Sequence, residues 1–108
     1  MDNKSKRVLI VEDDQFLREF YQELLGEEGY LIDVAADGEV GLNKLQGNVY
    51  DLVLLDIMLP KKDGLQILRE LKIAPPSTPP TIVVLTNLGQ DAVIKECFNL
   101  KRKLIVHE

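Results

Sequence analysis

The sequence has very few of the residues that crosslink small proteins or bind soft metals. Its 108 residues include one cysteine, one histidine and no tryptophan. Cys97 has no second cysteine to pair with, which excludes an internal disulfide and favours a reducing cytoplasm. No apolar run approaches the ~20 residues that cross a membrane, and the opening MDNKSKR lacks the apolar segment of a secretory signal. We therefore expect a cytoplasmic protein without a membrane partner.

The chain also lacks an excess of positive charge. Thirteen lysines and arginines face 18 aspartates and glutamates, giving a net charge of -5 and a pI near 4.9. This balance argues against direct nucleic-acid binding by these residues. The length fits one domain, large enough to bury a core without metal or disulfide. We predict a single domain over residues 1–108, with a flexible amino terminus at residues 1–6.

Short apolar runs alternate with segments of helical periodicity. Predicted strands cover residues 7–11, 30–36, 50–56, 81–86 and 103–106. Predicted helices cover residues 16–25, 37–45, 63–72 and 91–100. Gly29 can end the first helix in a left-handed conformation, and PPSTPP at 75–80 must be a loop. The alternation predicts an α/β fold with a parallel sheet covered on both faces.

Acidic residues stand where the apolar strands end. The first strand is followed by Glu12, Asp13 and Asp14, the third ends in Asp56, and the fourth ends in Thr86. Ligands of such sheets bind beyond the carboxyl ends of the strands, where the strand order reverses. If the first and third strands are neighbours, their carboxylates converge. Two such charges about 4 Å apart repel by roughly 4 kcal/mol at an effective dielectric constant of 20, so a bound cation would relieve the conflict.

Oxygen ligands without nearby histidine or cysteine select Mg²⁺, Mn²⁺ or Ca²⁺ over zinc. Mg²⁺ fits best because it accepts few carboxylates and completes its shell with water and phosphate oxygens. Simpler roles exist for each residue alone: Asp14 as a helix N-cap, Glu12 as a solvated loop residue, and Asp63 as a helix start. The joint placement of Glu12, Asp13 and Asp56 at two strand ends favours a metal site over these roles.

Four segments carry a family resemblance. VLIVEDDQFLREF, ADGEVGL, DLVLLDIMLPKKDG and TIVVLT resemble, in order and spacing, the receiver domain of bacterial two-component response regulators. The resemblance covers residues 7 to about 100. It implies a flavodoxin-like, three-layer sandwich around a parallel five-stranded sheet of order 2-1-3-4-5.

The resemblance also implies a role for each site residue. Asp56 would accept a phosphoryl group from a partner histidine kinase or phosphotransfer protein. Glu12 and Asp13 would hold Mg²⁺ or Mn²⁺ together with Asp56 and the main-chain carbonyl of Met58, and Thr86 would supply a switch hydroxyl. Three further residues match the family's loop after the third strand: Pro60, Asp63 and Gly64. The chain would thus be a signalling domain rather than an enzyme, capable at most of phosphorylating itself from phosphodonors and of dephosphorylating itself.

The end of the chain departs from the family pattern. The family has a lysine after its fifth strand, where this chain has Glu108 or, with a one-residue deletion, His107. The sequence also stops before a fifth helix, so we expect that helix to be missing and residues 101–108 to be a divergent or truncated end. Apolar surface beside the first helix would then stay uncovered and favour a homodimer, with the C-terminal segments as candidates for exchange.

These departures leave an alternative function open. The chain could be a receiver-like interaction module in which the absent lysine impairs phosphorylation switching. A flavin carrier on the same fold is disfavoured because EDDQ would repel the cofactor's phosphate. A dehalogenase-type phosphatase is disfavoured because Met58 stands where its second aspartate is required.

Overall fold

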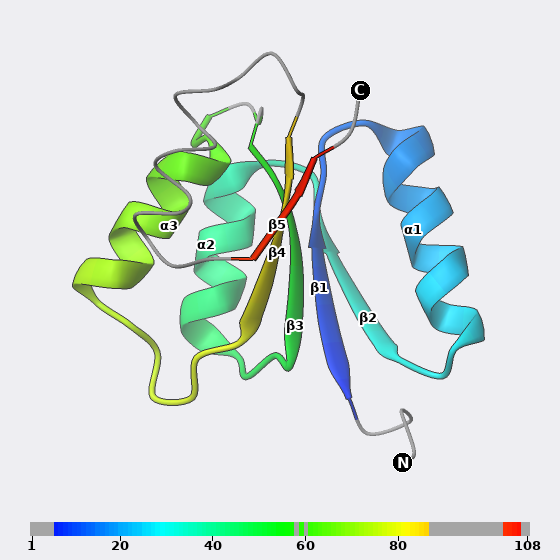
Figure 1. Cartoon of the computed structure of the whole chain (residues 1–108), viewed down its shortest axis with the longest axis horizontal. Coiled ribbons are helices and arrows are strands. Elements are labelled where there is room, and N and C mark those ends of the chain that lie inside the picture. Colours follow the sequence, from blue (N-terminus) through cyan, green and yellow to red (C-terminus); the bar gives the residue numbers. More distant parts are fainter. Residues whose placement is uncertain (1–5, 58, 60, 87–102, 107–108) are drawn as a thin grey trace.

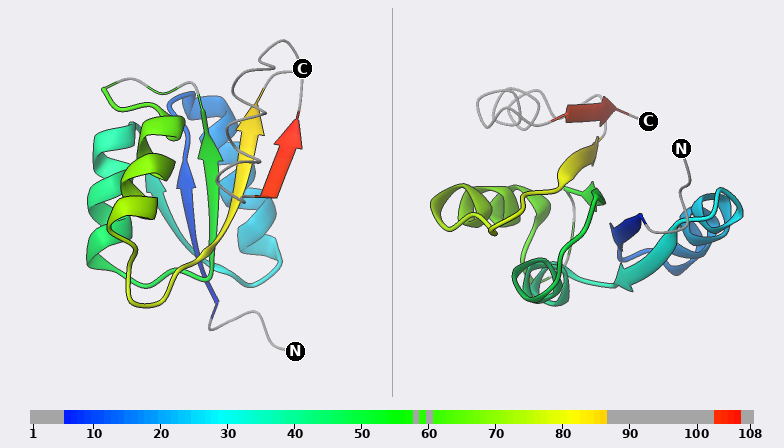
Figure 2. Two further views of the ribbon diagram at one scale, coloured as in Figure 1. Left: turned by 60° about the vertical axis from the view of Figure 1, so that its left-hand side comes forward. Right: turned by 90° about the horizontal axis from the view of Figure 1, so that it is seen from below.

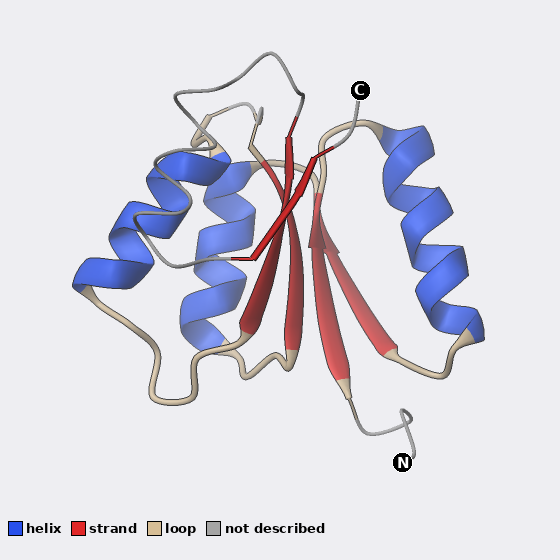
Figure 3. Cartoon of the chain, viewed as in Figure 1, coloured by secondary structure: helices blue, strands red, loops and turns tan. Residues whose placement is uncertain are grey.

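The computed structural model describes residues 6–57, 59, 61–86 and 103–106 (Figures 1 and 3). The described elements number eight: strands and helices alternate up to the fourth strand, and the fifth strand is the last. The strands are β1 (Arg7–Val11), β2 (Leu31–Ala35), β3 (Leu52–Asp56), β4 (Thr81–Thr86) and β5 (Lys103–Val106). The helices are α1 (Gln15–Glu27), α2 (Gly38–Gly47) and α3 (Gly64–Ile73). The predicted strands and first three helices are confirmed to within a few residues at each end. The predicted helix at 91–100 lies outside the described residues.

The five strands form one parallel sheet of order β2-β1-β3-β4-β5, which confirms the predicted flavodoxin-like topology. α1 covers one face of the sheet, and α2 and α3 cover the other, so the described elements form three layers (Figure 2). The chain passes from β1 outward to β2 and then returns to β3 on the other side of β1. The strand order therefore reverses between β1 and β3, which is where ligands of such sheets bind.

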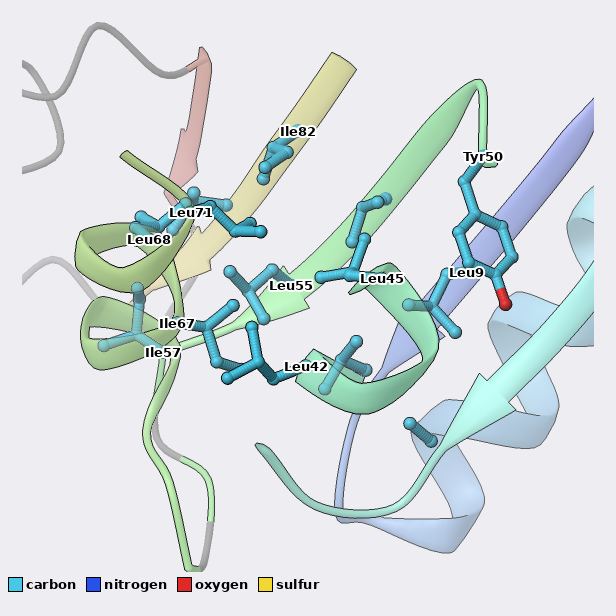
Figure 4. Close-up of a cluster of buried hydrophobic side chains, with 14 residues drawn as sticks. Leu9, Leu42, Leu45, Tyr50, Leu55, Ile57, Ile67, Leu68, Leu71 and Ile82 are labelled. Atoms are coloured by element: carbon cyan, nitrogen blue, oxygen red, sulfur yellow. The ribbon is translucent and has the colours of Figure 1, made fainter. Parts of the chain in front are cut away.

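The main hydrophobic core lies between the sheet and the helices α2 and α3 (Figure 4). These helices bury the side chains of Leu42, Leu45, Ile67, Leu68 and Leu71. The strands contribute alternate residues to the same cluster, namely Leu9, Val11, Ala35, Val53, Leu55, Ile82 and Val84. The sheet and two of its helices are thereby fixed as one packed unit.

Each described helix begins at an aspartate that caps its free amide groups. The carboxylates of Asp14, Asp37 and Asp63 accept hydrogen bonds from the main-chain N–H three residues later. α1 ends before Gly29, whose φ of 92° is the left-handed conformation predicted for it. α1 has 13 residues, and none of the described helices is long and apolar enough to span a bilayer.

Candidate functional site

Three carboxylates meet at the carboxyl ends of β1 and β3, the upper edge of the sheet in Figure 1. Val11 pairs with Leu55, so Glu12 and Asp56 follow on adjacent strands at the same height. One carboxylate oxygen from each of Glu12, Asp13 and Asp56 lies within 4.8 Å of the other two. We call these three residues the acidic pocket. The sequence placed them at two strand ends, and the sheet brings them together.

Glu12 is the buried member of the acidic pocket, with only 4% of its surface exposed. Its main-chain N–H donates to the Ala35 carbonyl at 3.0 Å, and its carboxylate accepts from the Asp14 N–H at 3.1 Å. The alternative of a solvated loop residue at this position is therefore wrong. The neighbouring strand end holds the main chain of Glu12 in place, and its side chain turns inward.

Burial raises the pKa of Glu12 to about 7, with the Asp14 N–H opposing the shift and the charge of Asp56 adding to it. Two ionised carboxylates cannot share a buried edge without compensation. Asp13 is exposed and Asp56 half-buried, so the pocket stays open to solvent on one side. An oxygen-only ligand set of this kind, with one open side, fits a hard divalent cation that keeps some of its water.

The start of α3 is held tightly against the end of β3. The N–H of Gly64 donates to the Ile57 carbonyl at 2.9 Å. A Cβ added at Gly64 would lie 2.4 Å from the carbonyl oxygen of Asp56, too close for any side chain. The glycine therefore lets the first turn of α3 approach the end of β3. This approach fixes the main chain that carries Asp56.

The loop after β3 contacts the start of α2. Lys61, at φ 66°, brings its ammonium to 3.6 Å from the Asp37 carboxylate. A Cβ added at Gly38 would lie 1.4 Å from the Lys62 carbonyl oxygen. Lys62 in turn pairs with Glu70 on α3 at 2.5 Å. The loop is thus packed between α2 and α3.

The remaining predicted site residues are placed less completely. Thr86 is the last residue of β4 and lies one position beyond Leu85, which pairs with Asp56, so its main chain reaches the same edge. Met58 and Pro60 lie outside the described residues. Asp63 caps α3 through its bond to the Gln66 N–H at 2.8 Å. Its role is therefore to start the helix.

Sequence reasoning missed two residues close to the pocket. The guanidinium of Arg18 donates to the main-chain carbonyls of Glu12 and Asp13. Burial raises the pKa of Tyr21, and the charges of Glu12 and Asp56 raise it further, so its hydroxyl lies within the field of the pocket. Both residues lie on α1. Their spacing gave no signal, because one side chain folds back along the loop and the other is part of an apolar row.

The family model for the response regulator receiver domain matches residues 8–106. This chain belongs to the response regulator receiver domain family. The receiver domain is 46% identical over 84 residues to the transcriptional regulatory protein DltR of Streptococcus agalactiae serotype III (strain NEM316), a match that covers 78% of this chain and 37% of the relative. It is 42% identical over 80 residues to the response regulator ArlR of Staphylococcus aureus (strain Mu50), a match that covers 74% of this chain and 35% of that relative. The chain spans little more than a third of these relatives.

Solved receiver structures share the fold. The receiver domain of the Francisella response regulator 1452 superposes with a TM-score of 0.84 at 26% identity, covering 94% of this chain and 84% of that one. The response regulator TrrA of Thermotoga maritima, solved in complex with Mg(2+)-BeF, superposes with a TM-score of 0.81 at 34% identity, covering 95% and 87%. The sheet order and three-layer arrangement described above are thus those of the family.

Proposed function

We propose that this receiver domain accepts a phosphoryl group on Asp56 from a histidine kinase or phosphotransfer protein, with Mg²⁺ in the acidic pocket. The observation that carries this proposal is the convergence of three carboxylates within 4.8 Å at the ends of β1 and β3, in a chain of the receiver family. The Mg(2+)-BeF complex of the neighbour TrrA supports the same ligand chemistry here.

In this reaction Asp56 would be the acceptor, and other site residues would hold the metal and contact the phosphoryl group. An oxygen of the half-buried Asp56 forms a bond to phosphorus while the bond from phosphorus to the donor's imidazole nitrogen breaks. Glu12 and Asp13, with Asp56 and the main-chain carbonyl of Met58, would hold the cation, and Mn²⁺ can replace Mg²⁺. The bound metal would neutralise charge on the transferred oxygens. Thr86 would then offer its hydroxyl to the phosphoryl group.

The proposed setting follows from the relatives and the charge. DltR is named a transcriptional regulator, and this chain matches 37% of its length, so a longer protein could couple the phosphoryl signal to DNA through other residues. With a net charge of -5, the receiver domain itself would not contact DNA directly. A cytoplasmic location fits the single Cys97. Catalysis would be limited to the domain's own phosphorylation and dephosphorylation.

The mass of the intact protein tests this proposal. After incubation with a small-molecule phosphodonor and Mg²⁺, the wild type should gain one phosphoryl group. Asp56→Asn should gain none, and omission of the metal should slow the gain strongly. A wild type that stays unmodified under conditions that modify another receiver domain would overturn the proposal. So would equal modification of Asp56→Asn.

A second candidate is a receiver-like interaction module with impaired switching. It is favoured by the residue at the position where the family resemblance expects a lysine that pairs with a phosphoryl oxygen. This chain has Glu108 there or, with a one-residue deletion, His107. Amide exchange in residues 81–86 and 103–106, with and without phosphorylation, separates the two functions. Strong changes there support a switching receiver, and unchanged exchange after phosphorylation supports the module.

We also propose a homodimer through α1, whose outward side chains Phe16, Phe20 and Leu24 are exposed. The exchange of C-terminal segments considered above involves residues 101–108, of which 101, 102, 107 and 108 lie outside the described residues.

A further inference from the structure

Arg18 connects the first turn of α1 to the main chain of the acidic pocket. Its Nη1 donates to the carbonyl oxygen of Glu12 at 2.9 Å and to that of Asp13 at 3.3 Å. The main-chain N–H of Arg18 donates to the Asp14 carbonyl at 2.9 Å, which fixes the Cα of Arg18 within the first turn of the helix. The side chain is half-buried. A side chain fixed at its main chain and at its guanidinium in this way makes rigid, charge-assisted hydrogen bonds and is not a mobile surface charge.

Main-chain N–H groups also restrain the loop that Arg18 reaches. The Glu12 N–H is bound to Ala35 on β2, and the Asp14 N–H is bound to the Glu12 carboxylate. Asp14 also caps α1 by accepting from the Leu17 N–H. Arg18 holds the two peptide carbonyls of Glu12 and Asp13, and the orientation of these peptides sets where both carboxylates point.

We propose that Arg18 is a positioning residue for the metal pocket: its guanidinium fixes the main chain at Glu12 and Asp13 and so presets their carboxylates for a divalent cation. This inference rests on the proposed function, because it assigns the pocket a metal. Partners that orient metal ligands from outside the coordination sphere change metal affinity by about ten- to a hundredfold when removed. Arg18 would act through the peptide groups and would not touch the metal.

The direction in which metal affinity changes when Arg18 is replaced separates a charge effect from a positioning effect. A guanidinium close to the pocket repels a divalent cation, so loss of its charge alone would tighten metal binding. Loss of positioning would weaken binding instead. Added salt screens the charge effect and leaves the positioning effect in place. The two roles of Arg18 therefore predict opposite changes in affinity.

The test is Mn²⁺ binding, followed by the electron paramagnetic resonance signal of the free ion. Arg18→Met keeps the length of the apolar stem and removes the donors, and we expect its Mn²⁺ affinity to fall about tenfold or more. Arg18→Lys keeps the charge and can bond one carbonyl, and we expect a smaller loss. Lys72→Met on α3 is the control for loss of one exposed positive charge and should bind like the wild type. The order should be the same at low and high salt.

Urea unfolding in EDTA separates positioning from a general loss of stability. A folded Arg18→Met with wild-type or tighter Mn²⁺ affinity overturns the inference. If Arg18→Met does not fold, Arg18→Lys decides, and wild-type affinity in that variant would overturn the inference equally.

Failure of the proposed function has a different signature. If the wild type does not bind Mn²⁺, the proposed metal site is wrong, but the proposed restraint of the loop by Arg18 is still open to test. Amide exchange of the Asp14 N–H in EDTA then decides, because this bond depends on the loop that Arg18 holds. Faster exchange in Arg18→Met supports the restraint, and unchanged exchange overturns it.

Discussion

The helices on the two faces of the sheet have similar apolar content but bury it to different extents. On one face, α2 and α3 bury five leucine and isoleucine side chains in the main core. On the other face, no residue of α1 is fully buried, and the exposed fractions of Phe16, Phe20 and Leu24 are 75%, 52% and 48%. An apolar row at helical spacing thus marks a surface that can be covered. Whether it is covered depends on the neighbouring elements.

α1 carries two apolar rows, and the sheet covers only one of them. Leu17, Tyr21 and Leu25 are half-buried on the side that packs against β1 and β2. The second row points outward and is flanked by the carboxylates of Glu19 and Glu23. The α2–α3 face should therefore carry most of the stability of the described fold, and the α1 face should carry contacts to other molecules.

Truncating one leucine on each face should reveal the largest difference. Leu68→Ala leaves a cavity in the core and should lower the free energy of unfolding by about 3 kcal/mol. Leu24→Ala removes a half-exposed side chain of the same size and should cost less than about 1 kcal/mol. Urea unfolding of both variants measures this difference. Equal losses would show that α1 contributes as much to stability as α3 does.

A bound metal should reduce the difference in stability between the two faces of the sheet. It would connect the loop that leads into α1 with the strand that leads into α3. At a Mg²⁺ concentration 100 times its Kd, the wild type should gain about 2.7 kcal/mol. Asp13→Asn should lose this gain while its metal-free form is at least as stable as the wild type, since one repelling charge is gone. Thermal unfolding with Mg²⁺ and with EDTA provides the measurement.

Asp14→Asn is the matched control for the metal prediction. Asparagine caps helices as well as aspartate does, and Asp14 lies outside the acidic pocket. Its Mg²⁺ response should equal that of the wild type. A normal response in Asp13→Asn would mean that the acidic pocket is not the metal site.

Replacing one glycine on α2 and one on α1 tests how tightly each face of the sheet is packed. Gly38→Ala would force a methyl group against the Lys62 carbonyl and should destabilise the fold by about 2 kcal/mol. Gly26→Ala on α1 meets nothing within 4 Å and should stabilise the helix by about 0.5–1 kcal/mol. Chemical unfolding of the pair gives opposite signs if the loop after β3 is as closely packed as the structure shows. A neutral Gly38→Ala would contradict that packing.

The sequence was sufficient for the features that depend on local pattern. β1, β4 and β5 could be predicted to the residue because continuous apolar runs suit strands buried in a parallel sheet. The meeting of Glu12 and Asp56 followed from the rule that parallel strands end at one edge. The burial of Glu12 could not be predicted, because adjacent acidic residues look alike until a neighbouring strand fixes one main chain. The sequence predicted uncovered apolar surface beside the first helix, but periodicity alone could not tell which apolar row of α1 faces outward.

The pH dependence of the metal-free protein tests the burial of Glu12 at the edge that both faces share. Its folded pKa of about 7 lies above its ordinary value of 4.5, so the fold favours the protonated form. The resulting stability is fully present below about pH 4.5 and is lost as the pH rises toward 7. We expect a loss of about 2 kcal/mol between pH 5 and 7.5 in EDTA. Glu12→Gln should remove this part of the slope in urea unfolding, and an unchanged slope would argue against the buried carboxyl.

The smallest effect on stability should come from the outward row of α1, where the proposed dimer would form. Phe20→Asp should change the free energy of unfolding by less than about 0.5 kcal/mol because the ring is half-exposed, yet it should abolish self-association. Glu19, Glu23 and Glu27 flank the row, so the carboxylates of two copies repel and added salt should strengthen the dimer. Ile73→Asp, which changes an 84% exposed side chain at the end of α3, is the matched control and should leave association intact. Light scattering across protein and salt concentrations measures the dimer, and a monomer at high concentration in high salt would assign the α1 face to a different partner.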